Sequence, residues 1–178
     1  MTTPLPQSRE APAPSGVRLA VEADLDRLAQ VWFDGWHKAH DALLPPDMVR
    51  QGTLTSFQRR LLALLPDTRV IGPVGAPLGF CVVRGDELQQ LFVSAETYGS
   101  GVAAALLADG EQRIAQRNLP VARLTCVLGN QRATRFFDKH GWRFVCVIRE
   151  VEVTESGTFP IDVCCYHKPV MYPQPPLA

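Results

Sequence analysis

One stretch near the middle of the chain constrains its fold more than any other. Residues 91–107 begin as a short apolar strand, pass through a turn that contains Gly99 and Gly101, and continue as an amphipathic helix. Glycine removes side chains where a ligand approaches the backbone. The N-terminus of the following helix offers unpaired N–H groups and a partial positive charge, and both suit a phosphate. The stretch therefore predicts an anion-binding turn.

Two other interpretations of the turn stay open at this point. In the first, glycine only relieves crowding between a strand and a helix. In the second, the turn belongs to a dinucleotide-binding fold, whose fingerprint normally opens a βαβ unit and is followed about 20 residues later by an acidic residue. Here the turn lies mid-chain, and the segment around Leu119 and Pro120 is not acidic. The dinucleotide interpretation is therefore the weaker of the two.

Length and charge indicate one ordinary globular domain. The 178 residues suffice for one well-buried domain and are few for two. A formal net charge of +0 gives no argument for nucleic-acid or membrane binding, and no apolar stretch approaches the ~20 residues of a membrane helix. Basic residues are in excess between 101 and 150, which favours an anionic ligand beside the turn. We expect neither a nucleic acid nor a membrane as partner.

The five cysteines predict buried thiols rather than a metal or disulfide site. Their spacing fits no metal site, and each lies in an apolar run that is typical of a strand, where cysteine behaves as a small hydrophobe. They are Cys81, Cys126, Cys146, Cys164 and Cys165. The N-terminus lacks a basic segment followed by an apolar run. We therefore expect a protein of the reducing cytoplasm that holds no metal.

The apolar pattern predicts a single mixed α/β domain over residues 17–168. A proline-rich tail precedes it (1–16), and a loose tail with further prolines follows it (169–178). The expected strands are 17–21, 68–71, 78–83, 87–93, 121–128, 142–153 and 159–168. The first expected helix begins at about residue 23 and ends before the prolines at 45 and 46, and the other expected helices are 47–65, 102–117 and 130–140. The order β-α-α-β-β-β-α-β-α-β-β implies a central mixed, mostly antiparallel sheet with helices on both faces.

The end of the first helix is a candidate pocket wall. Trp36, His37, His40 and Asp41 bring an aromatic ring, two imidazoles and an acid together just before the proline break. A lone histidine is more often structural, and two histidines without further ligands do not make a metal site. This segment and the closing hairpin are where we expect a second ligand.

Two signatures and the order of the elements resemble the GNAT superfamily of acyl-CoA-dependent N-acetyltransferases. The first signature, Q/R-x-x-G-x-G/A, is matched by the run Tyr98-Gly99-Ser100-Gly101-Val102-Ala103. The second, N-x-x-A-x-x-F-Y-x-x-x-G-F, is matched by Asn130, Ala133, Phe136, Phe137, Gly141 and Trp142. The resemblance covers residues 17–168, nearly the whole chain outside its tails.

The resemblance implies a GNAT-like fold and a role for each matching residue. Backbone groups of Leu91, Phe92 and Val93 would pair with the pantetheine arm of acetyl-CoA, and the 98–103 turn would hold its pyrophosphate. Asn130 would hydrogen-bond the arm, with Ala133 and Phe137 beside it. An N–H near Phe92 or Val93 would polarise the thioester carbonyl. The implied reaction is direct acetyl transfer from acetyl-CoA, the co-substrate, to a primary amine in a ternary complex.

Three positions depart from the family pattern. Tyr98 replaces glutamine or arginine, which leaves phosphate binding to backbone groups intact. Phe137 replaces a tyrosine that often protonates the departing thiolate; a thiol with a pKa near 8.5 leaves tolerably without help. Thr125 stands where some relatives carry a glutamate base. Because of these departures a second function is also compatible with the sequence, namely an acyl-CoA-binding sensor or accessory module with little catalytic turnover.

The amine must lose a proton, and the sequence offers several candidates for the base. Glu87, at the start of the strand that would carry the cofactor contacts, is the main one, although it also fits an exposed acid at a strand start. His37 and His40 are its rivals because of their ordinary pKa range. Tyr166 on the closing hairpin would line the acceptor pocket with Trp36. The amine itself is not identified, and the edge of the hairpin offers a surface for a homodimer.

Overall fold

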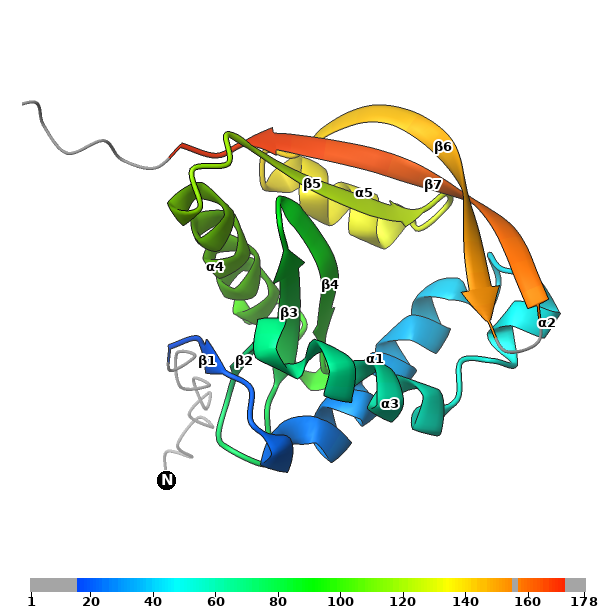
Figure 1. Ribbon diagram of the computed structural model, residues 1–178, viewed down its shortest axis with the longest axis horizontal. Helices are drawn as coiled ribbons and strands as arrows, with labels where there is room; N and C mark the ends of the chain where they lie inside the picture. Colours follow the sequence, from blue (N-terminus) through cyan, green and yellow to red (C-terminus); the bar gives the residue numbers. More distant parts are fainter. Residues whose placement is uncertain (1–15, 155–156, 172–178) are drawn as a thin grey trace, which may run out of the picture.

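The computed structural model describes residues 16–154 and 157–171, and within them one sheet runs in the order β1-β2-β3-β4-β5-β7-β6. Its strands are β1 (Arg18–Leu19), β2 (Thr68–Ile71), β3 (Gly79–Arg84), β4 (Glu87–Val93), β5 (Val121–Val127), β6 (Arg143–Thr154) and β7 (Gly157–Pro169). Only β4 and β5 are parallel neighbours; the other pairs are antiparallel. The mixed, mostly antiparallel sheet of the sequence prediction is confirmed (Figure 1).

Helices cover both faces of this sheet, as the sequence predicts. They are α1 (Leu25–His40), α2 (Pro46–Val49), α3 (Leu54–Leu64), α4 (Val102–Gln116) and α5 (Gln131–Lys139), with short 3₁₀ turns at Glu22–Asp24, Leu65–Asp67 and Ala95–Thr97. Successive residues of β3 point to opposite faces. Phe80 and Val82 join the core under α1 and α3, whereas Cys81 and Val83 join the core under α4.

The expectation of one helix over residues 47–65 is wrong. The chain forms α2, leaves the helical path around Gly52, and starts α3 at Leu54. Thr53 is the reason for the new start: its extended backbone and its hydroxyl, which accepts the N–H of Ser56 at 3.1 Å, cap the N-terminus of α3. The break matters because it opens the surface between α2 and α3.

The sheet divides between β4 and β5. The two strands share a single register pair, Glu87 with Arg123, and then separate (Figure 1). Directly after Glu87 the ladder between β3 and β4 shifts by one residue, because Val82 pairs with Gln90 while Val83 pairs with Leu88. Such a bulge bends a strand and increases its twist. The later part of β4 therefore has no β5 partner along one edge.

The closing hairpin of β6 and β7 is longer than the sheet beneath it. β5 ends at Val127 opposite Val163, the N–H of Leu128 still donates to the carbonyl of Asp162, and from Ile161 towards Gly157 β7 pairs with β6 alone. Pro160 lies in this part, where the missing N–H removes no bond to β5. Figure 1 shows β6 and β7 running past α5 and descending towards α2. The predicted turn residues Glu155 and Ser156 lie outside the described residues.

The structure also bears on the predictions for the two tails, the cysteines and membrane helices. Residues 169–178 are not loose from their start, because Val170 is buried and its N–H donates to Pro120 at 2.9 Å. Cys146 is exposed on β6 although all five cysteines were expected to be buried, and the five are free thiols. The N-terminal tail prediction lies almost entirely outside the described residues. Across the described ranges, no helix has the length and apolarity needed to cross a bilayer.

Candidate active site

A cavity of about 160 Å³ lies where β4 separates from β5, between α1, α4 and α5; we call it the β4–α5 cavity. It is lined by eight residues that the sequence assigned to a cofactor: Leu91, Phe92, Val93, Tyr98, Ala103, Asn130, Ala133 and Phe137. Residues about 40 positions apart in the chain thus meet at one place. Both sequence signatures border the same space.

Four further residues line the β4–α5 cavity and were missed by sequence reasoning: Gly35, Ala39, Arg132 and Phe136. Gly35 and Ala39 come from α1, four residues apart on one face of that helix. Small residues at this spacing are a signal that could have found them, since they let another element approach closely. The ring of Phe92 takes up that space beside Gly35.

The glycine turn has the backbone that only glycine adopts easily. Gly99 and Gly101 have φ of 79° and 89°, and a Cβ added to either would meet nothing within 4 Å. Glycine is therefore required by the backbone conformation and not by lack of space. Gly101 is the N-cap of α4, and no side chain caps that end. Ser100 donates its hydroxyl to Thr97, and Val102 is buried in the core.

Two cationic side chains lie against the ring of Tyr98, beside the glycine turn. The Arg132 guanidinium lies 3.5 Å from the centre of its ring, and the Lys38 ammonium lies 5.0 Å from it. Such cation–π contacts position a charge without neutralising it. Positive charge from α1 and α5 therefore gathers at the mouth of the β4–α5 cavity, although Tyr98 itself replaces a polar or basic residue of the family pattern.

Asn130 and Phe137, both from the second signature, line the β4–α5 cavity in different ways. The Asn130 side-chain oxygen accepts the N–H of Ala133 at 3.1 Å and so caps α5. Its amide NH₂ is then the group left for a ligand. Phe137 is buried and packs against Trp142 and Tyr166, with ring centres 6.1 and 6.0 Å away. It offers the cavity an apolar surface and no proton.

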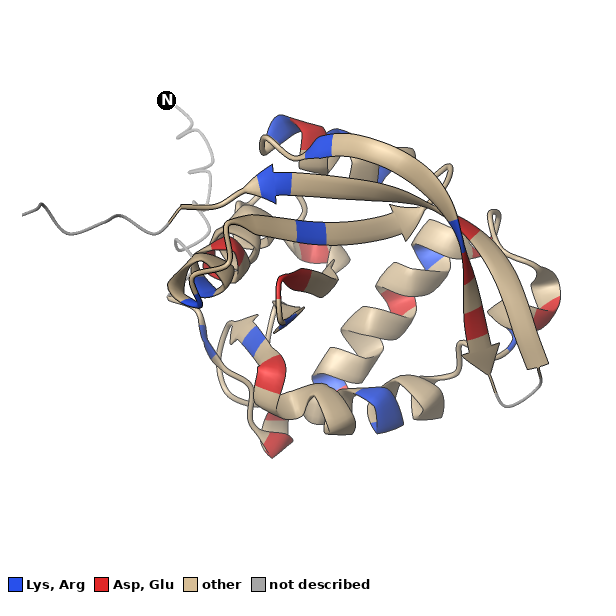
Figure 2. Cartoon of the chain, turned by 45° about the horizontal axis from the view of Figure 1, so that its top comes forward, with Lys and Arg blue, Asp and Glu red and all other residues tan. Residues whose placement is uncertain are grey.

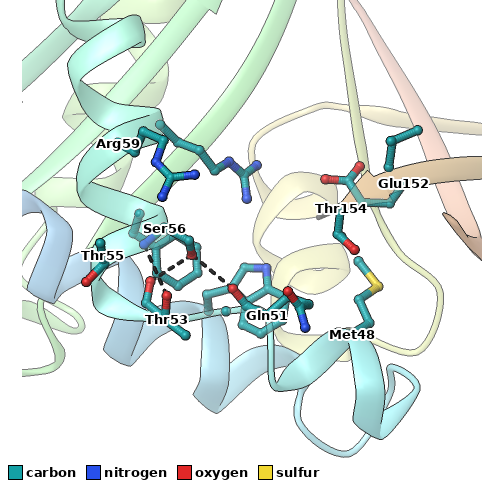
Figure 3. Close-up of a pocket in the computed structure, with 13 residues that line it drawn as sticks. Met48, Gln51, Thr53, Thr55, Ser56, Arg59, Glu152 and Thr154 are labelled. Carbon is teal, nitrogen blue, oxygen red and sulfur yellow. Dashed lines mark hydrogen bonds between the residues drawn. The ribbon is translucent and has the colours of Figure 1, made fainter. Parts of the chain in front are cut away.

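A second cavity, of about 640 Å³, lies between α3 and the distal part of β6; we call it the α3–β6 cavity (Figure 3). Trp36 lines it, as the sequence predicted for the acceptor pocket. The remaining wall comes from the break between α2 and α3 and from the end of β6: Met48, Gln51, Gly52, Thr53, Thr55, Ser56, Phe57, Arg59, Arg60, Glu152, Val153 and Thr154. α1 thus borders both cavities, through Gly35 and Trp36.

The two histidines line neither cavity. His37 contacts Asp41 through Nδ1 at 2.7 Å and the carbonyl of Gly52 through Nε2 at 2.6 Å, so it ties the end of α1 to the segment before α3. His40 is buried, burial lowers its pKa, and its Nδ1 has no hydrogen-bond partner among the described residues. His37 therefore lies behind the wall of the α3–β6 cavity, where it supports Gly52, and His40 lies in the interior.

Tyr166 is also misplaced by the sequence prediction. It lies on β7 opposite Leu124 and is buried in the core under α4 and α5, and it lines neither cavity. Alternation along β7 explains this, because Tyr166 and Cys164 point to the same core as Leu124. The sequence could place Tyr166 on the hairpin but not on the correct face.

Three carboxylates approach one another on the side of the α3–β6 cavity. Glu87 lies half-buried at the start of β4, where it accepts a hydrogen bond from Gln89 at 3.1 Å. Glu150 and Glu152 are two residues apart on β6 and share a face of the strand. Burial raises the pKa of Glu150, and the charges of Glu87 and Glu152 raise it further. Figure 2 shows acidic positions near the end of β6 and basic positions on α3.

Sequence reasoning missed Glu150 and Glu152, and it placed Glu87 correctly at the start of a strand. The signal for the missed pair was the alternation Glu-Val-Glu over 150–152, which puts both carboxylates on one side of a strand. Among the described residues, no group of three or more histidine, cysteine, aspartate or glutamate side chains is placed to hold a metal ion.

The glycine turn at the start of α4 and the signature residues around the β4–α5 cavity are the features that resemble an acyltransferase. A model of the acetyltransferase (GNAT) family matches residues 25–142, and the chain belongs to this family. No curated protein matches the chain.

Solved structures share the fold at low sequence identity. A GCN5-related N-acetyltransferase from Rhodopseudomonas palustris has a TM-score of 0.65 at 18% identity, over 86% of this chain and 94% of that one. A ribosomal-protein-alanine N-acetyltransferase from Brucella melitensis gives 0.63 at 19%, over 86% and 98%. The PaiA N-acetyltransferase from Thermoplasma acidophilum, solved with coenzyme A, gives 0.61 at 17%, over 82% and 96%. These similarities establish the fold and not the acceptor.

Proposed function

We propose that the protein transfers an acetyl group from acetyl-CoA to a primary amine by direct attack in a ternary complex. One observation carries this proposal: the β4–α5 cavity collects residues of both sequence signatures at the point where β4 leaves β5. Family membership supports acyl transfer in general. The acetyl donor, the amine acceptor and the residue roles below are our own assignments.

The residues around the β4–α5 cavity suit acetyl-CoA. Backbone groups of β4 after Glu87 face no β5 partner, so Leu91–Val93 can pair with the pantetheine amides as a strand would. The turn at Gly99–Gly101 can hold the pyrophosphate on N–H groups at the uncapped start of α4. Lys38 and Arg132 add positive charge there, and the Asn130 amide can donate to the arm. The PaiA N-acetyltransferase, which has a similar fold, was solved with coenzyme A, and this supports the choice of cofactor.

Acetyl transfer requires a base for the amine, a group that stabilises the oxyanion and a route for the thiolate to leave. The amine nitrogen forms a bond to the acetyl carbon while the carbon–sulfur bond breaks, and its proton must pass to a base. Glu87 and Glu150 are our candidates, because they lie close enough for their charges to interact and the pKa of Glu150 is raised by burial. A β4 N–H at Phe92 or Val93 stabilises the developing oxyanion. The thiolate leaves without a tyrosine, since Phe137 has no hydroxyl.

Thermal unfolding with acetyl-CoA, CoA and NAD tests the cofactor first. A ligand at 100 times its dissociation constant stabilises the fold by about 2.7 kcal/mol. We expect both CoA species to raise the melting temperature and NAD to leave it unchanged. No shift with either CoA species would contradict the proposal.

Thiol release from acetyl-CoA in the presence of amines tests the transfer itself. We expect release that depends on the amine and yields an N-acetyl product. CoA binding without release over a broad set of amines would favour the sensor or accessory module instead. The free thiols of all five cysteines fit a reducing compartment such as the cytoplasm, where we place the activity.

A further inference from the structure

The α3–β6 cavity carries opposite charges on facing walls. Arg60 comes from α3 and Glu152 from β6, and both side chains line the cavity. Glu152 acts on Arg60 through charge interaction, so the two groups lie within electrostatic reach of each other. Within the part of the chain that the structure describes, however, neither side chain has an ion pair or a hydrogen bond. Figure 3 shows the neighbouring Arg59 on the wall opposite Glu152.

The Arg60 guanidinium is held in place by aromatic rings rather than by a carboxylate. It lies 4.7 Å from the centre of the Trp32 ring and 5.9 Å from that of Phe57, and both rings are buried. Desolvation by the surrounding atoms lowers its pKa, and the charge of Glu152 offsets this only in part. Arg60 as a whole is exposed and lines the cavity, so its guanidinium is accessible to a ligand there. An anionic group in the cavity would pair with it.

The opposite wall attracts a cation. Glu152 lies on the cavity, and Glu150 lies two residues earlier on the same face of β6, towards Glu87. The two walls come from different elements, α3 and β6, and among the described residues no ion pair or hydrogen bond joins Arg60 to Glu152. A ligand with both charges satisfies both walls at once.

We propose that the acceptor is a small amine that also carries a carboxylate, such as an amino acid or a short peptide. Arg60 binds its carboxylate, and Glu150 and Glu152 attract its amine as an ammonium group. Trp36 and Phe57 contact its apolar part, and a volume of about 640 Å³ leaves room for a large side chain or a second residue. This assignment rests on the proposed function and narrows its substrate class.

Matched pairs of amines test the proposal. Each carboxylate-bearing amine, for example phenylalanine or a phenylalanine-containing dipeptide, is compared with its carboxamide, which differs only in the negative charge. Thiol release gives kcat/KM, and calorimetry with CoA present gives affinity without turnover. For the wild-type protein we expect the carboxylate form to be preferred by about 10- to 100-fold in kcat/KM and in affinity.

Variants of Arg60 test whether this residue binds the carboxylate. Arg60→Gln should remove the preference by weakening only the carboxylate form, and Arg60→Lys should keep part of it, since the charge remains while the planar stacking is lost. Arg60→Glu should reverse the charge preference, so that an amine with a second ammonium group is used better than one with a carboxylate. Arg135→Gln, on the exposed surface of α5, is the matched control and should change nothing. The melting temperature and CoA shift of each variant show that its fold and cofactor site persist.

Each outcome supports or overturns the assignment. Equal use or equal binding of acid and amide overturns it while leaving amine acetylation intact, and so does a preference that survives in Arg60→Gln. If no amine is acetylated, the proposed function fails, yet calorimetry still decides whether the cavity prefers the carboxylate form. A failure of every carboxylate-bearing amine to bind overturns the assignment in either case.

Discussion

The β4–α5 cavity and the α3–β6 cavity share α1 as a wall but are built in different ways. The first is made of backbone, glycine and small or aromatic residues from elements of the central fold. The second, about four times larger, has two arginines, Arg59 and Arg60, on one wall and the carboxylate of Glu152 on the other, and the end of the closing hairpin forms part of it. The comparison teaches that backbone and shape dominate the cavity we propose for the cofactor, with cations only at its mouth, whereas side-chain charges of both signs line the cavity we propose for the acceptor.

Filling the β4–α5 cavity should produce the largest effect. In Ala133→Trp an indole occupies much of a cavity of about 160 Å³. We expect affinity for CoA to fall by about 100-fold or more, which abolishes the thermal shift with CoA. Arg135→Trp, on the exposed face of the same helix, is the control and should keep the shift. An unchanged shift in Ala133→Trp would show that CoA binds elsewhere.

A substitution in the glycine turn should have an intermediate effect. Gly101→Ala places a Cβ on a residue with φ of 89°, at a cost of about 1–2 kcal/mol. We expect the melting temperature to fall by about 2–8 °C and CoA affinity to fall with it. Gly85→Ala, at φ of 59° and remote from both cavities, should lose stability but keep CoA affinity. Equal affinity in both variants would leave the turn with a structural role only.

The carboxylates on the acceptor side should give the smallest effect, a displacement of the pH profile. Because burial and the negative charges of Glu87 and Glu152 raise the pKa of Glu150, we expect kcat/KM to fall with acid above the ordinary glutamate range near ~4.3. Glu87→Gln removes one of those charges, lowers the pKa of Glu150 and moves the acid limb to lower pH.

Two further variants sharpen that measurement. Glu150→Gln should abolish the acid limb if Glu150 is the base, and leave it in place if Glu87 is. Glu22→Gln, an exposed acid far from both cavities, should not move the profile. A limb that stays at the same pH in all three variants would remove both glutamates from consideration as the base.

The difference between the cavities also explains what the sequence could predict. The glycine turn and the signature from Asn130 to Trp142 are local patterns with fixed spacing, so the starts of α4 and α5 and eight of the residues that line the β4–α5 cavity could be predicted from the sequence. These features depend on backbone conformation and on contacts close in sequence.

The acceptor side depends on contacts that no local pattern contains. A cap at Thr53 splits the predicted helix and exposes Gln51 and Gly52 to the cavity. Glu152 reaches α3 only because β6 continues past the end of β5. The strand faces of Tyr166 and the helix-end contacts of His37 were settled by tertiary packing, and here sequence reasoning chose the wrong surroundings.

The unsupported part of the hairpin has a consequence for how such a protein changes over time. Between Gly157 and Ile161, β7 has β6 as its sole strand neighbour. Few core contacts therefore constrain the length of this part of the hairpin. Insertion or loss of a residue pair in this segment would move Glu152 relative to Arg60 without disturbing the cores or the β4–α5 cavity. If the α3–β6 cavity holds the acceptor, as we propose, new acceptors can be acquired by changes in this part of the hairpin while the β4–α5 cavity is inherited unchanged.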